Sequence, residues 1–145
     1  MNSRLCTALA ILSLALPALA TPVTAQDAAV GEKEFAKCKA CHSITAPDGT
    51  TILKGGKTGP DLYGIIGRKV GADPAFAARY KESIKAVGET GLVWDEAELA
   101  AYITDPKAWL DQKLGSQDAK TGMSWKQKVK QADIAAYLAT ATPGQ

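Results

Sequence analysis

The chain has 145 residues, which suits one small domain with one hydrophobic core. Its 17 Lys and Arg side chains against 15 Asp and Glu leave a formal net charge of +2. This near-balance argues against a nucleic-acid-binding protein, whose domain is normally decidedly basic.

The N-terminal segment has the features of a secretory signal peptide. Arg4 precedes an apolar run from Leu5 to Leu19, and Val23-Thr24-Ala25 offers small residues for cleavage after Ala25. The run is shorter than the ~20 apolar residues that span a membrane, and no later segment approaches that length. We expect residues 1–25 to be removed and residues 26–145 to form one exported, periplasmic domain that is not membrane-embedded. Because Arg4 is the only charged residue lost, its net charge falls from +2 to +1.

A first helix is expected from Val30 to Ala40, with Gly31 and Phe35 as an i, i+4 pair on one face. It leads into Cys38-Lys39-Ala40-Cys41-His42. In a helical turn this spacing places both sulfurs beside one face of a planar macrocycle and points the following imidazole at its metal. The motif predicts one covalently attached haem c, with Cys38 and Cys41 as thioether positions and His42 as an iron ligand.

Two cysteines in an exported chain also suit a disulfide or a dithiol redox pair. A thioredoxin-like protein would need a strand before the motif and a mixed sheet after it, yet the chain shows hardly any period-2 alternation. Without the leader residue Cys6, the chain lacks the four ligands of a structural zinc site. Haem is favoured, and a haem-free dithiol protein is the alternative.

A second helix is expected after Trp94, because Asp95 can cap it and Glu98 follows three residues later. It should end at Asp105-Pro106, where proline cannot continue the helical hydrogen bonds but can open another turn. The stretch before it is rich in glycines, which we expect to form turns around a flat ligand. These are Gly55, Gly56, Gly59, Gly64, Gly67, Gly71, Gly88 and Gly91.

The last helix is the clearest by period, because Ile134, Tyr137, Leu138 and Ala141 recur at i, i+3, i+4 and i+7. Pro143-Gly144 should end it. Its apolar stripe needs a partner, and the first helix offers one, since a glycine lets two helices cross closely. These short helices predict an all-α fold whose interior includes the haem. The apo protein should be poorly folded, because burying such a ring at roughly 25 cal/mol per Å² contributes several kcal/mol.

Met123 is the only methionine outside the leader. An iron already held by His42 has this thioether available as its second axial ligand. His/Met ligation raises the reduction potential of a haem and suits electron transfer.

Together these motifs resemble a class I cytochrome c, specifically the bacterial cytochrome c2 or c550 type with long insertions. The resemblance covers essentially all of residues 26–145. Its landmarks are Gly31 with Phe35, Cys38 to His42, Thr58 to Gly64, Gly67-Arg68-Lys69, Trp94, Tyr102, Pro106, Thr121-Gly122-Met123 and the segment from Ile134 to Leu138. It implies the class I cytochrome c fold, short helices wrapped around a covalent haem.

The resemblance also implies roles for individual residues. The Pro60 carbonyl should accept the Nδ1–H of His42, and the Tyr102 phenol should lie against the Met123 sulfur. The implied propionate donors are Arg68, Tyr80 and Trp94, with Thr121 adding a hydroxyl. Trp125 stands where the family usually has a phenylalanine that shields the haem edge.

Two groups of lysines flank the haem motifs. They are Lys37, Lys39, Lys54 and Lys57 near the attachment site, and Lys120, Lys126, Lys128 and Lys130 near Met123. One ring of such charges would steer an acidic partner and raise its association rate by about 10 to 10³-fold. A solvated helix face is the plainer alternative.

The function implied by the resemblance is one-electron transfer by a monomeric shuttle, not an enzyme. Its donor would be the cytochrome bc1 complex, and its acceptor a photosynthetic reaction centre or a terminal cytochrome oxidase. Compared with short relatives, the chain has extra residues between His42 and Pro60 and between Pro106 and Met123. The second insertion, from Trp109 through Asp118, is expected to loosen the arm that carries Met123. A haem enzyme or gas-binding sensor with a displaceable sixth ligand is therefore the alternative.

Overall fold

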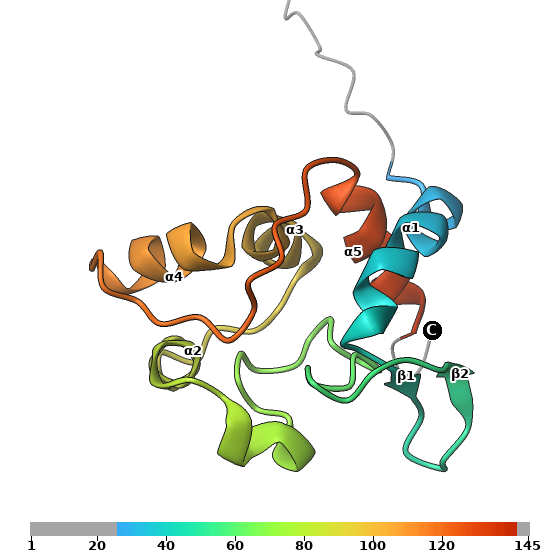
Figure 1. The fold of residues 1–145 in the computed structure, drawn as a ribbon, viewed down its shortest axis with the longest axis horizontal. Coiled ribbons are helices and arrows are strands. Elements are labelled where there is room, and N and C mark those ends of the chain that lie inside the picture. The colour runs from blue at the N-terminus through green and yellow to red at the C-terminus, as the bar shows by residue number, and fades with distance from the viewer. Residues whose placement is uncertain (1–25, 142–145) are drawn as a thin grey trace, which may run out of the picture.

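The computed structural model describes residues 26–141. The expected signal peptide and Pro143-Gly144 lie outside this part of the chain. The helices are α1 (Ala28–Glu34), α2 (Glu82–Glu89), α3 (Glu96–Thr104), α4 (Pro106–Leu114) and α5 (Gln131–Thr140), with 3-10 helices η1 (Phe35–Ala40) and η2 (Pro74–Arg79). The strands are β1 (Ile44–Thr45) and β2 (Thr51–Leu53). Helices dominate (Figure 1), which confirms the predicted all-α class apart from one small antiparallel pair.

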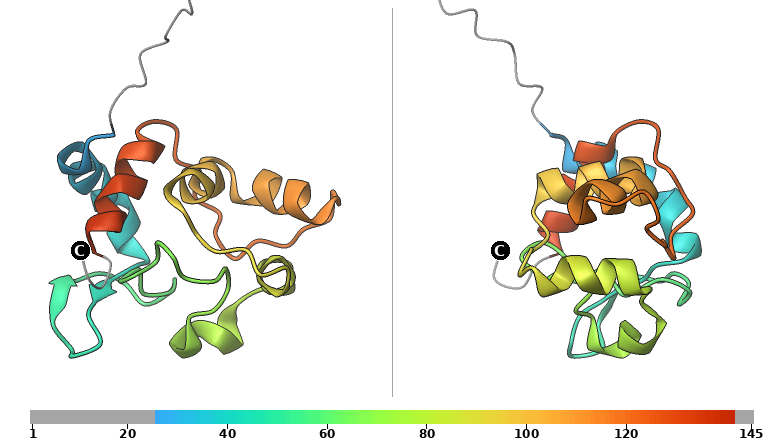
Figure 2. Two further views of the ribbon diagram at one scale, coloured as in Figure 1. Left: turned by 180° about the vertical axis from the view of Figure 1, so that it is seen from behind. Right: turned by 90° about the vertical axis from the view of Figure 1, so that its left-hand side faces the viewer.

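The first and last helices of the described chain cross closely, as Figures 1 and 2 show for α1 and α5. Gly31 is buried at the crossing, and a Cβ there would overlap the backbone carbonyl of Asp133. One turn further on, the fully buried Phe35 ring packs on Tyr137 with their centroids 5.5 Å apart. The backbone N–H of Asp27 also donates to Asp133 Oδ1 at 2.9 Å. The predicted pairing of these two helices is confirmed.

The single helix expected from Val30 to Ala40 is two helices. The α-helix ends at Glu34, and the tighter η1 continues to Ala40. At its end both Cys41 N and His42 N donate to Cys38 O at 3.0 Å. The bond from Cys41 N spans three residues, as in a 3-10 helix, and the bond from His42 N spans four, as in one turn of α-helix.

An Asp-Pro pair joins α3 to α4, as expected from the sequence. Asp95 caps α3 by accepting from Glu98 N at 2.7 Å, and α3 ends at Thr104. Asp105 then caps α4 through Ala108 N at 3.2 Å, with Pro106 in the first helical position. Figure 1 shows α3 between the α1–α5 pair and α4.

The second insertion does not give the loose arm that we expected. It folds as α4, which buries Trp109 and Leu110 and ends at Gly115 in a left-handed conformation. The chain beyond it is tied back, because Ala119 N donates to Asp111 Oδ1 at 3.0 Å and Lys120 N donates to Ser83 Oγ at 2.8 Å. The inserted segment is therefore packed against the rest of the protein rather than forming a loose loop.

Four elements were not predicted from the sequence, although the i, i+3 spacing of Ile84 and Val87 in α2 is helical. The extra residues after His42 form the hairpin of β1 and β2, and the stretch before Trp94 forms η2 and α2. Gly88 is not a turn residue as predicted. It lies inside α2, where a Cβ would overlap the carbonyl of Val70. None of the helices in residues 26–141 is long and apolar enough to cross a membrane.

Candidate functional site

Cys38 and Cys41 lie at the C-terminal end of η1, one turn apart. Both thiols are free, with Cys38 half-buried and Cys41 exposed. Burial raises the pKa of the Cys38 thiol to about 11. A dithiol redox centre needs a lowered pKa to supply a thiolate, so this environment opposes the haem-free alternative.

His42 is oriented by one hydrogen bond from its ring. Its Nδ1 lies 2.8 Å from the Pro60 carbonyl oxygen, to which it donates its proton. Burial lowers the pKa of His42, opposed by the Pro60 hydrogen bond and the Asp61 carboxylate. A neutral imidazole with Nδ1–H engaged presents its Nε2 lone pair to a metal.

The segment before Pro60 packs directly on the haem motif. A Cβ on Gly55 would overlap the carbonyl of His42, and one on Gly59 would overlap the His42 ring. Glycine at these two positions lets the Pro60 carbonyl reach the ring. These residues were expected only as turns, so their close packing is a finding of the structure.

Asp61 was not among the predicted site residues, although it follows Pro60. Its carboxylate accepts from Ser43 Oγ at 2.7 Å, from Thr45 N at 3.1 Å and from Tyr63 N at 2.9 Å. Asp61 therefore ties the loop that carries Pro60 to the segment that follows His42. Burial raises the pKa of Asp61, but the hydrogen bonds from Tyr63, Ser43 and Thr45 outweigh burial and hold that pKa below its usual value.

Replacing Asp61 by Asn is expected to destabilise the holoprotein near pH 7 by about 1 kcal/mol, allowing for solvent screening. A carboxyl whose pKa is lowered by folding contributes stability above its unfolded pKa of about 3.9 and loses it as the pH falls through the folded value. The difference between variant and wild type should therefore shrink below about pH 4. Denaturant unfolding from pH 3 to 7 measures it. The exposed Asp118→Asn serves as control, and a pH-independent difference would contradict the expectation.

Arg68 and Tyr80, two predicted propionate donors, lie near a buried carboxylate. Arg68 donates to the carbonyl of Asp61 at 2.9 Å and to that of Tyr63, and its Nη1 lies 3.7 Å from Asp73 Oδ2. Burial raises the pKa of Tyr80, and the nearby Asp73 charge adds to the effect. The guanidinium has five N–H donors, so it can hold these protein acceptors and a further anion.

Trp94 is only 5% exposed, and within residues 26–141 its Nε1 has no hydrogen-bond partner. A buried N–H left unpaired costs about 1–3 kcal/mol. An acceptor such as a haem propionate would remove that cost, so this donor fits the predicted cofactor.

Tyr102, Thr121 and Met123 are brought together from α3 and the arm beyond α4. Thr121 Oγ1 accepts from Met123 N and donates to Met123 O, both at 3.0 Å. Burial raises the pKa of Tyr102 to about 12, and the nearby Thr121 hydroxyl opposes this rise. The Thr121 hydroxyl thus supports the Met123 turn, and its contact with a haem propionate stays a prediction. Met123 itself packs half-buried against the core.

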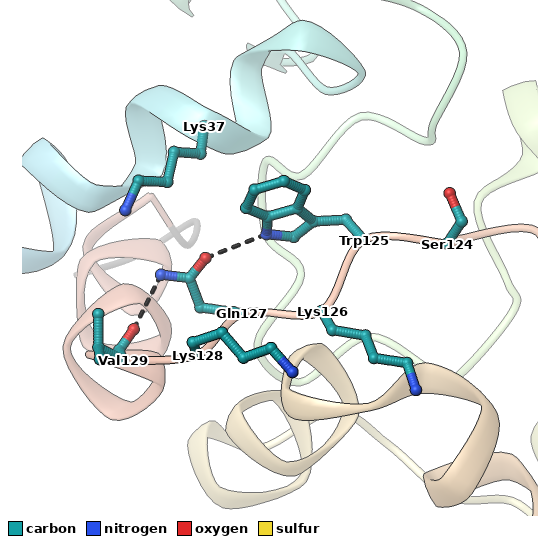
Figure 3. A pocket seen from close by; sticks show the side chains of 7 residues that line it. All are labelled: Lys37, Ser124, Trp125, Lys126, Gln127, Lys128 and Val129. Carbon is teal, nitrogen blue, oxygen red and sulfur yellow. Dashed lines mark hydrogen bonds between the residues drawn. The ribbon is translucent and has the colours of Figure 1, made fainter.

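The arm beyond Met123 borders a surface groove of about 470 Å³ (Figure 3). Trp125 and Val129 are 49% and 54% exposed there. Between them the buried Gln127 accepts from Trp125 Nε1 at 3.0 Å and donates to the Val129 carbonyl at 2.8 Å. Trp125 is thus held with half of its surface in solvent.

All eight predicted docking lysines are exposed. The groove brings together one lysine from the attachment side, Lys37, and two from the Met123 side, Lys126 and Lys128 (Figure 3). Ion pairs join Lys37 to Glu34 at 2.6 Å, Lys126 to Asp105 at 2.5 Å and Lys130 to Asp133 at 3.3 Å. The other predicted lysines are exposed outside this groove; they are Lys39, Lys54, Lys57, Lys120 and Lys130.

Known proteins resemble this chain over most of its length. It is 56% identical to cytochrome c2 of Rhodobacter capsulatus over 122 residues, which are 84% of this chain and 88% of the relative. It is 53% identical to cytochrome c-550 of Paracoccus denitrificans over 137 residues, 93% of this chain and 85% of the relative. The X-ray structure of cytochrome c2 from Paracoccus denitrificans matches with a TM-score of 0.79 at 52% identity, covering 83% of this chain and all of that one.

No protein-family model matches the chain. Within residues 26–141 no cluster of three or more His, Cys, Asp or Glu side chains is arranged to hold a metal ion. Identities above half, over more than four fifths of the chain, show its ancestry. The chain belongs to the cytochrome c2/c-550 family, electron carriers of the class I cytochrome c fold that hold one covalently attached haem c and are not enzymes.

Proposed function

We propose that this protein is a periplasmic one-electron carrier in which His42 and Met123 are the axial ligands of a haem c joined to Cys38 and Cys41. The observation that carries the proposal is the hydrogen bond from His42 Nδ1 to the Pro60 carbonyl at 2.8 Å. It fixes the tautomer and the ring direction that an iron ligand needs and makes the imidazole more basic.

The haem supplies the exchange of a single electron. The chain's own residues hold and orient it, through two thioethers and the His42 ring. Trp94 offers an unpaired buried N–H for a propionate, while Arg68 and Tyr80 lie near Asp73. Because these proposed propionate donors are buried or held by hydrogen bonds, the haem site can gain or lose one electron without a rearrangement of its side chains. Small reorganisation is what an electron carrier requires.

Optical spectra of the ferric holoprotein test the ligand set. Wild type is expected to show the far-red charge-transfer band of thioether ligation, and Met123→Ala should lose it because no other methionine remains after export. Ser124→Ala, an exposed neighbour, is the matched control and should keep the band. A wild type without the band, or a Met123→Ala variant that retains it, would refute His42/Met123 ligation and favour the haem enzyme or gas sensor.

We also propose that the groove of Lys37, Trp125, Lys126 and Lys128 meets an acidic partner. The donor would be the cytochrome bc1 complex, and the acceptor a photosynthetic reaction centre or a cytochrome oxidase, met by a monomer. Positive charges around a half-exposed ring support brief docking, in which electrostatic attraction sets the encounter rate.

Lys128→Glu is expected to slow electron transfer from the reduced bc1 complex by about tenfold at low salt. Lys69→Glu makes the same charge change outside both lysine groups and should slow it far less. Stopped-flow rates at several ionic strengths measure both variants, and they should converge as salt screens the charges. Equal slowing by the two variants would mean that net charge, rather than this groove, governs docking.

Residues 1–25 are proposed as a cleaved leader and residues 26–145 as one cytochrome c domain. The mass of the holoprotein recovered from the periplasm tests both statements. Cleavage after Ala25 predicts the mass of residues 26–145 plus one haem. Any larger polypeptide mass would place the cleavage site earlier or show that the leader is retained.

A further inference from the structure

Three large aromatic rings pack on one another beside the Met123 arm. The Trp94 and Trp109 rings are stacked at 5.1 Å with 25° between their planes. Tyr102 meets Trp94 at 5.1 Å and meets the Trp109 ring edge-on at 5.3 Å and 82°. Trp109 is only 4% exposed and comes from α4, in the inserted segment.

The outer edge of Trp109 is anchored by charged groups of α3 and α4. Its Nε1 donates to Glu98 Oε2 at 2.8 Å, and the other carboxylate oxygen of Glu98 accepts from Lys113 Nζ at 2.5 Å. Lys113 Nζ also lies 5.5 Å from the centroid of the Trp109 ring. The indole is therefore held in position by a hydrogen bond and by a cation.

The inner faces of the cluster lead toward the proposed haem ligand. Trp109 packs against Tyr102, which lies near the Thr121 hydroxyl. That hydroxyl in turn holds both the N–H and the carbonyl of Met123. Trp109 also stacks on Trp94, whose N–H is unpaired within residues 26–141. Trp109, a side chain of the insertion, thus packs against Trp94 and Tyr102, the two residues that the family resemblance places beside the haem.

We propose that Trp109 is a positioning residue for the Met123 side of the haem. By holding Tyr102 and Trp94 in place it keeps the Met123 turn closed over the iron and limits the entry of small ligands. This inference rests on the proposed function, because it concerns the sixth position of the His42/Met123 haem. It opposes the expectation that the insertion makes that position easier to displace.

The affinity of the ferric holoprotein for imidazole, a neutral ligand small enough to compete with a thioether, tests the role of Trp109. Trp109→Leu removes the stack and is expected to raise this affinity about tenfold, a change of about 1.4 kcal/mol, as for contacting residues that act together. Leu110→Ala is the matched control, since Leu110 is fully buried on the same helix but belongs to none of the three ring pairs. It should lower stability while leaving imidazole affinity within about twofold of wild type.

Equal imidazole affinity in Trp109→Leu and wild type would overturn the positioning role, and so would an equal gain in Leu110→Ala. If Trp109→Leu yields no holoprotein, Trp109→Phe keeps an aromatic ring without the indole N–H and is expected to raise the affinity about threefold. An unchanged affinity in that variant overturns the role as well. A wild type that lacks the thioether band contradicts the proposed function itself, whereas a wild type with the band and an inert Trp109 variant contradicts only this inference.

Discussion

Replacing both Cys38 and Cys41 by alanine is expected to leave a polypeptide without covalent haem and without a cooperative thermal transition. Several side chains are only half-buried against the core, among them Tyr80, Tyr102 and Met123. In the holoprotein the apolar ring would cover such side chains. Its burial, at roughly 25 cal/mol per Å², contributes several kcal/mol, a large share of the stability of a small domain.

Circular dichroism with heating and a haem stain on a denaturing gel measure this prediction. Cys41→Ala alone is the control. It keeps the half-buried Cys38 thioether and His42, so we expect a holoprotein with one thioether and a lowered thermal midpoint. A double variant that unfolds cooperatively at the wild-type temperature without haem would show that the fold does not depend on the cofactor.

Gly31→Ala is expected to lower the unfolding free energy of the holoprotein by about 3 kcal/mol or more. The added Cβ would overlap the carbonyl oxygen and carbon of Asp133, so α1 and α5 would have to separate. Backbone atoms of a helix cannot rotate away as a side chain can. Separation would also weaken the packing of Phe35 on Tyr137.

Chemical denaturation of both holoproteins measures this loss. Ala29→Ser is the matched control, because it adds an atom at an exposed position of the same helix. It should stay within about 0.5 kcal/mol of wild type, as exposed substitutions usually do. Wild-type stability in Gly31→Ala would mean that the helices do not cross as closely as described.

Sequence patterns predicted the parts of the fold that depend on residues close together in the chain. The cap at Asp95, the stop at Asp105-Pro106 and the period of the last helix each act within a few residues, and all three are present. The helix crossing at Gly31 was also predictable, because a glycine on an apolar helix face allows a second helix to pack closely against that face.

Other features depend on contacts between distant segments. The sequence between Val30 and Ala40 does not distinguish an α-helix from a 3-10 helix, since the tighter turn forms where the motif meets Gly56, whose N–H donates to the Lys39 carbonyl at 2.8 Å. Asp61 serves three donors that only the folded loop brings together. Trp109 looked like part of a loose insertion, because its ring partners are 7 and 15 residues away, on α3 and in the segment before α3.

Exposure of the ferrous holoprotein to carbon monoxide tests most directly whether both axial positions are filled. A six-coordinate His42/Met123 haem predicts an optical spectrum that is unchanged under saturating carbon monoxide in wild type, and prompt formation of the adduct in Met123→Ala. The variant shows that the gas reaches an open iron. Prompt adduct formation in the wild type would contradict the electron-carrier account and establish an open haem that binds ligands.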